Sequence, residues 1–243
     1  MTGSSGVIWH DVECGGYAED LPLWRELAAA AGGPVLDVGA GTGRVSLDLA
    51  SRGFEVVALD IDGELLAALR ERAASAGLSV QTVCADARAF DLGAGRFGLI
   101  AVPMQTLQLL EDAEARTAFL RCARRGLREG GVVAAALADA LESFDAASDA
   151  LPEPDVATVA GITYTSLPLA VVDEGDRAAI HRLRQVSPAA NGEGEHHDVV
   201  RLTRLDAATL AEEAAAVGLE AETARRIPAT DVYVGSTLVV LRG

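Results

Sequence analysis

The sequence contains no lysine, so arginine supplies all 20 basic side chains, against 36 aspartates and glutamates. The formal net charge is -16 at pH 7. Nucleic-acid binding draws heavily on positive charge to neutralise phosphates. This balance argues against a nucleic-acid partner and favours a neutral or cationic small molecule. The one dense group of arginines has helical spacing, which predicts a solvated helix face rather than a binding patch. It comprises Arg116, Arg121, Arg124, Arg125 and Arg128.

Cysteine is also scarce. Cys14, Cys84 and Cys122 are far apart and form no Cys-x-x-Cys pair. This spacing supports neither a disulfide framework nor a zinc cluster, so no metal site is predicted. Cys84 and Cys122 are expected to be small buried side chains.

Long apolar runs are missing as well. None reaches the roughly 18–20 residues needed to span a bilayer. Residues 1–10 lack the basic start and apolar middle of a secretory signal. We therefore expect a cytoplasmic protein with no membrane partner, as a monomer or a homodimer.

What the sequence does contain is strand–helix alternation with short connections. This pattern predicts an α/β fold with a doubly wound, mostly parallel, seven-stranded Rossmann-like sheet. Strands are expected at 35–38, 54–59, 79–83, 97–102, about 131–137, about 219–226 and about 233–241. Helices are expected at 18–31, 43–51, 63–76, 112–126 and 207–217. Asp62 and Asp206 are placed to cap two of these helices.

The alternation is interrupted after residue 140. Segments 156–172, 176–187 and 198–204 are rich in β-formers, and 188–197 is a polar loop. We expect 150–204 to be an antiparallel β insertion that binds the acceptor or a second subunit. Residues 33–149 and 205–243 would form the Rossmann-like domain. Residues 1–32 would form an N-terminal lid and helix.

The most informative stretch is 35–43, Val-Leu-Asp-Val-Gly-Ala-Gly-Thr-Gly. An apolar strand enters a turn in which Gly39, Gly41 and Gly43 let the backbone lie close to a ligand. The dinucleotide fingerprint needs its third glycine at the position that Arg44 occupies. The spacing therefore points away from NAD and toward another adenosyl ligand.

Carboxylates follow three successive strands. Asp37 ends the first, Asp60 the second, and Asp86 follows the third. Ligands of open α/β sheets bind beyond the carboxyl ends of the strands, where Asp60 could accept both ribose hydroxyls and Asp86 the adenine amino group. Ile61 and Ala87 would provide apolar walls for the purine.

Together, 35–46, Asp60, Asp86 and 97–110 resemble the motifs of class I S-adenosylmethionine-dependent methyltransferases, and more closely those acting on small molecules. The resemblance covers about residues 33–137. It implies S-adenosyl-L-methionine as the cofactor and S-adenosyl-L-homocysteine as the product. A cationic sulfonium without phosphate suits the acidic strand ends. The implied cofactor-binding set is Tyr17, Asp37, Gly39, Ala40, Gly41, Gly43, Asp60, Ile61, Asp86, Ala87 and Val102.

Methyl transfer is an in-line displacement that needs alignment and exclusion of water, and a base only where the nucleophile must lose a proton. By resemblance, Tyr17 would lie near the methyl group and Gln105 where the acceptor approaches. His10 is the most plausible base. Other side chains have open roles: Gln108 and His181 could face the acceptor, Asp11 and Glu13 could hold a cation, and His196 with His197 is weak evidence for a metal.

The leading hypothesis is methyl transfer to a nitrogen or an oxygen of a small molecule, with nitrogen slightly favoured. The alternatives are an NAD-dependent oxidoreductase, a non-catalytic module that binds the donor for assembly, and an RNA or protein methyltransferase. The strand-four stretch lacks the Asn/Asp-Pro-Pro-Tyr signature of nucleic-acid and protein amino methylation.

Overall fold

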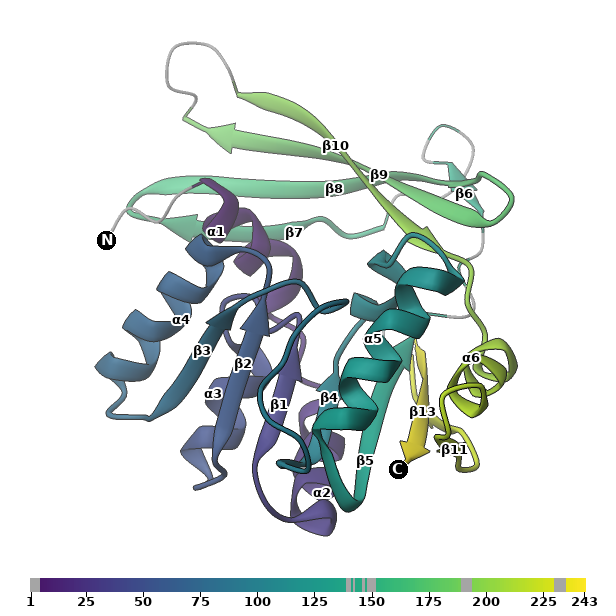
Figure 1. Cartoon of the computed structure of the whole chain (residues 1–243). Coiled ribbons are helices and arrows are strands. Elements are labelled where there is room, and N and C mark those ends of the chain that lie inside the picture. The colour runs from purple at the N-terminus through teal and green to yellow at the C-terminus, as the bar shows by residue number, and fades with distance from the viewer. Residues whose placement is uncertain are drawn as a thin grey trace.

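The structure is a computed structural model that describes residues 5–138, 141, 143–145, 147, 152–188, 194–229 and 235–243. Its central sheet runs in the order β11-β13-β5-β4-β1-β2-β3 (Figure 1). The parallel strands are β1 (Val35–Val38), β2 (Val56–Asp60), β3 (Val80–Cys84), β4 (Phe97–Val102) and β5 (Leu127–Leu137). β13 (Ser236–Arg242) is antiparallel to β5. The predicted α/β fold is confirmed.

Helices cover both faces of this sheet. α2 (Leu21–Ala31), α3 (Arg44–Ser51) and α4 (Gly63–Ser75) pack on one face, and α5 (Ala113–Gly126) and α6 (Ala207–Ala215) on the other. Successive residues of β1 point to opposite faces of the sheet. Val35 packs into the apolar cluster under α2 and α3, and Leu36 into the cluster under α5 and α6, and neither has exposed surface. The predicted caps are confirmed: Asp62 accepts from two amides of α4, and Asp206 accepts from the amide of Thr209.

The predicted strand 219–226 is divided in two. β11 (Glu220–Ala221) and β12 (Arg225–Ile227) both pair with β13. Four residue steps separate Ala221 from Arg225, but only three separate their partners on β13, Leu241 and Leu238. The extra residue is a bulge that interrupts the ladder, so β12 is an eighth strand among the described residues.

A second, antiparallel sheet lies across the carboxyl ends of the central strands (Figure 1). Its strands are β6 (Phe144–Asp145), β7 (Asp155–Val159), β8 (Ile162–Asp173), β9 (Arg177–Ser187) and β10 (Glu195–Thr203). The predicted antiparallel region is therefore present. β10 begins at Glu195 rather than at 198, because Glu195 pairs with Gln185 within the ladder. Residues 189–193 of the predicted loop lie outside the described residues.

The N-terminal stretch is helical: α1 (Ser5–His10) continues into a π-helix, η1 (Asp11–Gly15). The lid expected here therefore has regular structure. Trp9 is buried against the edge of Tyr164 from the antiparallel sheet, with ring centroids 5.4 Å apart. No helix within the described ranges combines the length and apolarity needed to cross a bilayer.

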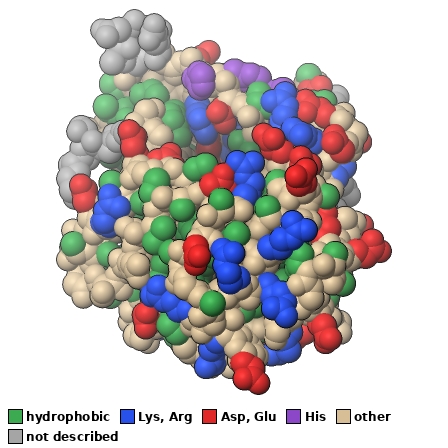
Figure 2. Space-filling model, in the orientation of Figure 1, with side chains coloured by type: hydrophobic (Ala, Val, Ile, Leu, Met, Phe, Trp, Pro, Cys, Tyr) green, Lys and Arg blue, Asp and Glu red, His purple; other side chains and the backbone are tan. Residues whose placement is uncertain are grey.

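Two expectations about individual side chains were wrong. Arg116 is not on a solvated face: it is buried and paired with Glu213 of α6, which joins the two helices. Arg121, Arg124, Arg125 and Arg128 are exposed, as expected, although Arg125 also donates to the carbonyl of Phe90. Figure 2 shows arginines and acidic side chains intermixed rather than gathered into one basic patch on this face. Cys84 is exposed rather than buried, because it lies on the edge strand β3.

Candidate functional site

A cavity of about 660 Å³ lies at the carboxyl ends of β1, β2 and β4, under the antiparallel sheet. Its floor is the turn after β1, with Asp60 and Asp86 from the next two strands. His10 and Glu13 reach it from the N-terminal helices. The loop after β4 contributes one side, and β9 and β10 contribute the roof. Segments distant in sequence thus enclose one volume.

Asp37 is fully buried, and its Oδ2 accepts a hydrogen bond of 2.6 Å from the Ser46 hydroxyl. Its Oδ1 is buried and has no hydrogen-bond partner among the described residues, and the residue itself is part of the cavity lining. Burial raises the pKa of Asp37 to about 6, against the opposing effects of Ser46 and Arg44. An unpaired buried carboxylate oxygen is costly, so this atom indicates a place for a cationic ligand group.

The carboxylates of Asp60 and Asp86 differ in how far they are already engaged. Asp60 accepts the amides of Gly41 at 2.7 Å and Asp62 at 2.9 Å, one on each oxygen, which leaves lone pairs for two hydroxyls. Asp86 accepts three contacts from the Arg88 guanidinium and one from its amide. These hydrogen bonds lower the pKa of Asp86. A ligand amino group must share Asp86 with Arg88.

The three glycines of the turn have positive φ angles of 71°, 54° and 97°. A Cβ on Gly39 would meet Thr106, one on Gly41 would meet the His10 ring, and one on Gly43 would meet Leu69. The space that glycine leaves is therefore taken up by side chains that cover the turn. Gly39 and Ala40 line the cavity, whereas Gly43 allows α3 and α4 to pack closely.

His10 is held against the glycine turn by a polar relay. Thr42 donates its hydroxyl proton to Asp11 at 2.8 Å, and Asp11 is paired with Arg72. The His10 Nδ1 lies 3.3 Å from the same hydroxyl, so Nδ1 must carry a proton to complete the contact. The Nε2 then carries the lone pair. Burial lowers the pKa of His10, which keeps the ring neutral.

Arg44, at the position of the absent third glycine, fixes the chain that leads to α2. Its guanidinium donates to both oxygens of Asp20, which has no exposed surface, and to the Tyr17 carbonyl at 2.9 Å. The cation also lies 5.1 Å from the Tyr17 ring centroid. Tyr17 therefore packs behind Arg44, beside a smaller cavity that it shares with Met104 and Gln105.

Glu13 joins the N-terminal helices to the roof. It accepts two hydrogen bonds of 2.8 Å from Arg184 and one from Ser166. Burial alone would raise the pKa of Glu13, but these hydrogen bonds outweigh it and lower the pKa. Asp11 is engaged in the same way by Arg72. Both carboxylates thus serve as ties between segments, which argues against the expectation that they hold a cationic substrate.

The loop after β4 separates its two glutamines. Gln105 lines the main cavity, whereas Gln108 is buried away from it. The Gln108 amide donates to the carbonyls of Ala138 and Thr203, each at 3.1 Å, and accepts from the Ala138 amide at 2.8 Å. Gln108 therefore links the end of β5 in the central sheet to β10 in the antiparallel sheet. The expectation that it contacts the substrate is not supported.

The remaining histidines lie apart from the cavity lining. His181 packs against His197 with ring centroids 5.3 Å apart, while its neighbours Ile180 and Arg182 line the cavity. Strand alternation explains this arrangement. Among the residues the structure describes, no group of three potential metal ligands occurs.

The cavity brings together many of the predicted residues: His10, Asp37, Gly39, Ala40, Asp60, Ile61, Asp86, Ala87 and Gln105. Tyr17, Gly41, Gly43 and Val102 do not line it, and Val102 is buried within β4. Sequence reasoning did not assign Arg44, Met104 or Arg182 to the site. Only Arg44 carried a signal, as the break in the dinucleotide spacing. Met104 has a positive φ of 53°, which its sequence did not indicate.

A cavity over acidic strand ends, on a parallel sheet closed by an antiparallel last strand, defines the class: this is the fold of class I methyltransferases, whose methyl donor is S-adenosylmethionine. Residues 35–131 match the family described as "Methyltransferase domain". The match agrees with the resemblance predicted from the sequence over these residues.

Comparisons with individual proteins agree. An uncharacterised Mycobacterium tuberculosis protein (strain H37Rv) is 36% identical over 109 residues, or 43% of this chain and 40% of that protein. The chain thus spans less than half of the curated relatives it matches. CalS10, an amino pentose methyltransferase from Micromonospora echinaspora whose structure holds S-adenosylmethionine, superposes with a TM-score of 0.75 at 21% identity, covering 100% and 98% of the chains. KedS8, a sugar N-methyltransferase from Streptoalloteichus, superposes with a TM-score of 0.74 at 20% identity, covering 100% of this chain and 94% of KedS8. At these identities the likeness is one of fold.

Proposed function

We propose that the chain transfers a methyl group from S-adenosylmethionine to an amine nitrogen of a small molecule. The donor site consists of the turn after β1 with Asp37, Asp60 and Asp86. The acceptor site lies between the loop after β4 and the antiparallel sheet. KedS8 is named a sugar N-methyltransferase and CalS10 an amino pentose methyltransferase, and these descriptions support a nitrogen acceptor. An oxygen acceptor is the alternative.

The observation that carries this proposal is the unpaired Oδ1 of Asp37. Buried carboxylate oxygens seek partners, and the α-ammonium of the donor is a cation of suitable chemistry. Burial raises the pKa of Asp37 to about 6, so a cationic ligand group would stabilise its ionised carboxylate. Two lone pairs left on Asp60 suit ribose hydroxyls. The residues present therefore fit the donor.

When bound, the donor supplies a methyl group on a positively charged sulfur. The chain's own contribution is to align the acceptor and to exclude water, which the closed roof and the N-terminal helices support. Gln105 is the polar side chain best placed to orient the acceptor. His10 is the candidate base, because the Thr42 hydroxyl, which donates to Asp11, sets the tautomer that leaves the Nε2 lone pair free, and burial favours the neutral ring.

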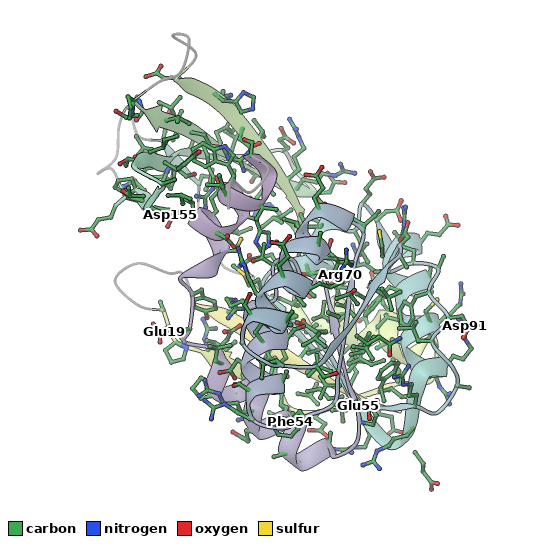
Figure 3. The ribbon with its side chains drawn as sticks, turned by 90° about the vertical axis from the view of Figure 1, so that its left-hand side faces the viewer. Glu19, Phe54, Glu55, Arg70, Asp91 and Asp155 are labelled. Atoms are coloured by element: carbon green, nitrogen blue, oxygen red, sulfur yellow. The ribbon has the colours of Figure 1, made fainter. Side chains whose placement is uncertain are left out.

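Calorimetry tests the donor site directly. We expect S-adenosylhomocysteine to bind and NAD not to bind. Replacing Asp60 by alanine should weaken S-adenosylhomocysteine binding at least tenfold, whereas D91A, on an exposed loop, should not (Figure 3). Binding of NAD in place of S-adenosylhomocysteine, or an unchanged affinity in D60A, would overturn the proposal.

A further inference from the structure

Arg182 stands in the roof of the cavity, on β9. Ile180 and Arg182 line the cavity from this strand, and Val200 and Leu202 line it from β10. The roof is therefore apolar apart from one guanidinium. Its side chain is 21% exposed, so water screens it only in part.

One edge of this guanidinium is anchored. Nη1 donates to Asp155 Oδ2 at 2.9 Å and lies 3.4 Å from the Ser166 hydroxyl. Figure 3 labels Asp155 where the antiparallel sheet meets the N-terminal helices. The Nε and Nη2 atoms make no hydrogen bond to any residue that the structure describes. The side chain is thus held in place with three of its five N–H donors unused.

The other arginines around the cavity are already committed. Arg44 donates through both terminal nitrogens to Asp20, and Arg88 does so through Nε and Nη2 to Asp86. Behind the roof, Arg184 is shared between Glu13 and Asp198. Within the described part of the chain, Arg182 is the cation of the acceptor side with a free pair of donors.

We infer that Arg182 binds an oxyanion of the acceptor, a carboxylate or a phosphate, and thereby selects acceptors that carry one. This inference rests on the proposed function, since it names the chemistry of the acceptor for the same cavity. A guanidinium with two free parallel donors matches the two oxygens of such a group, and partial burial strengthens the pairing. The exposed carboxylates of Asp62 and Glu111 also line the cavity, but they are open to solvent.

The inference runs against the overall charge. A net charge of -16 favours a neutral or cationic substrate, yet Asp11 and Glu13 are neutralised by arginines. In the roof, the polar atoms left without a partner among the described residues are the Nε and Nη2 donors of Arg182. Arg182 is a specificity residue in this scheme, and it takes no part in the transfer itself.

Calorimetry on the chain saturated with S-adenosylhomocysteine tests this role with three amino sugars: glucosamine, glucosamine 6-phosphate and glucosaminic acid. We expect the wild type to bind at least one of the two anionic probes at least tenfold more tightly than glucosamine. R182Q should abolish this preference, and R182K, which keeps the charge but loses the paired donors, should retain only part of it. R121Q, at an exposed position of α5, is the control for lost charge and should behave as the wild type.

The two anionic probes separate phosphate from carboxylate recognition. Equal binding of all three sugars by the wild type, or an undiminished preference in a folded R182Q or R182K, would overturn the inference. Thermal melting establishes that each variant is folded. If S-adenosylhomocysteine itself fails to bind, the proposed function fails. The same comparison of probes on the unliganded chain then decides the role of Arg182 separately.

Discussion

Glu13 and Arg184 face each other across two segments that are 171 residues apart in sequence, joined by two hydrogen bonds of 2.8 Å. Both side chains are largely buried, with 11% and 17% exposure. The pair fastens the π-helix to the antiparallel sheet and so closes the cavity on one side. Arg184 also lies over the Trp9 ring, at 5.4 Å from its centroid, which extends the same contact to α1.

Replacing Glu13 by glutamine should lower the free energy of unfolding by about 2–3 kcal/mol, because it leaves the Arg184 charge without its closest partner. Hydrogen exchange should accelerate in residues 5–17. E195Q, an exposed position in the same sheet, is the control. The lowered pKa of Glu13 gives the sign of the pH effect: its stabilisation is present at neutral pH and is lost as the pH falls through the folded-state pKa. Unchanged exchange in E13Q would show that the pair does not hold the segment.

Replacing Asp37 should have opposite effects on the stability of the protein and on its affinity for S-adenosylhomocysteine. Its folded pKa of about 6 lies above its ordinary value of 3.8, so its contribution to stability is greatest at acid pH and is lost as the pH rises through about 6. D37N should therefore stabilise the unliganded protein at pH 8 by on the order of 2 kcal/mol. It should also weaken S-adenosylhomocysteine binding at least tenfold. Denaturant titration and calorimetry on the same samples measure the two effects.

The wild-type affinity should also depend on pH. Between about pH 8 and about pH 5, S-adenosylhomocysteine binding should weaken, since protonation of Asp37 removes the partner of the ligand ammonium. D37N should lack this dependence. A variant and a wild type with the same pH profile would remove Asp37 from the donor site.

His10 is tested by separating turnover from binding. H10Q should lower kcat about 100-fold and leave the affinity for S-adenosylhomocysteine within about twofold, as expected for a lost base. The lowered pKa of His10 means that wild-type activity should persist to a lower pH than an ordinary histidine base would allow. T42V should disturb the His10 tautomer, which nitrogen NMR shifts report. A loss of affinity with kcat retained would instead make His10 a contact of the donor, in keeping with its place over Gly41.

Gln108 should matter for stability rather than for chemistry. Q108L keeps the shape but leaves the amide and carbonyl of Ala138 and the carbonyl of Thr203 without these partners, which should cost about 3 kcal/mol. Q81L, on the edge strand β3, is the control. Denaturant unfolding measures the change, and a cost below about 1 kcal/mol would contradict the role assigned to Gln108.

Much of the site followed from local patterns. The run Val35–Val38 into alternating glycines fixed the turn, and the aspartates after β1, β2 and β3 had to converge because parallel strands end at one edge. The resemblance supplied the donor. Sequence patterns did not separate Gln105 from Gln108, since both lie between β4 and α5. Only their tertiary contacts differ: Gln105 lines the cavity, and Gln108 bonds Ala138 and Thr203. They likewise placed Tyr17 in the site, although Arg44 intervenes between its ring and the cavity.

The sequence by itself determined the class of the protein, because a glycine turn, strand-end carboxylates and strand–helix periodicity are local features that need no knowledge of distant contacts. Only the tertiary structure decided which charged side chains are paired with one another and which keep unused hydrogen-bonding atoms. Glu13 and Asp11 are paired with arginines far away in the chain, while Asp37 and Arg182, both in the cavity lining, keep atoms without a partner among the described residues. Pairing of this kind depends on how the two sheets and the N-terminal helices meet, which no stretch of sequence encodes alone.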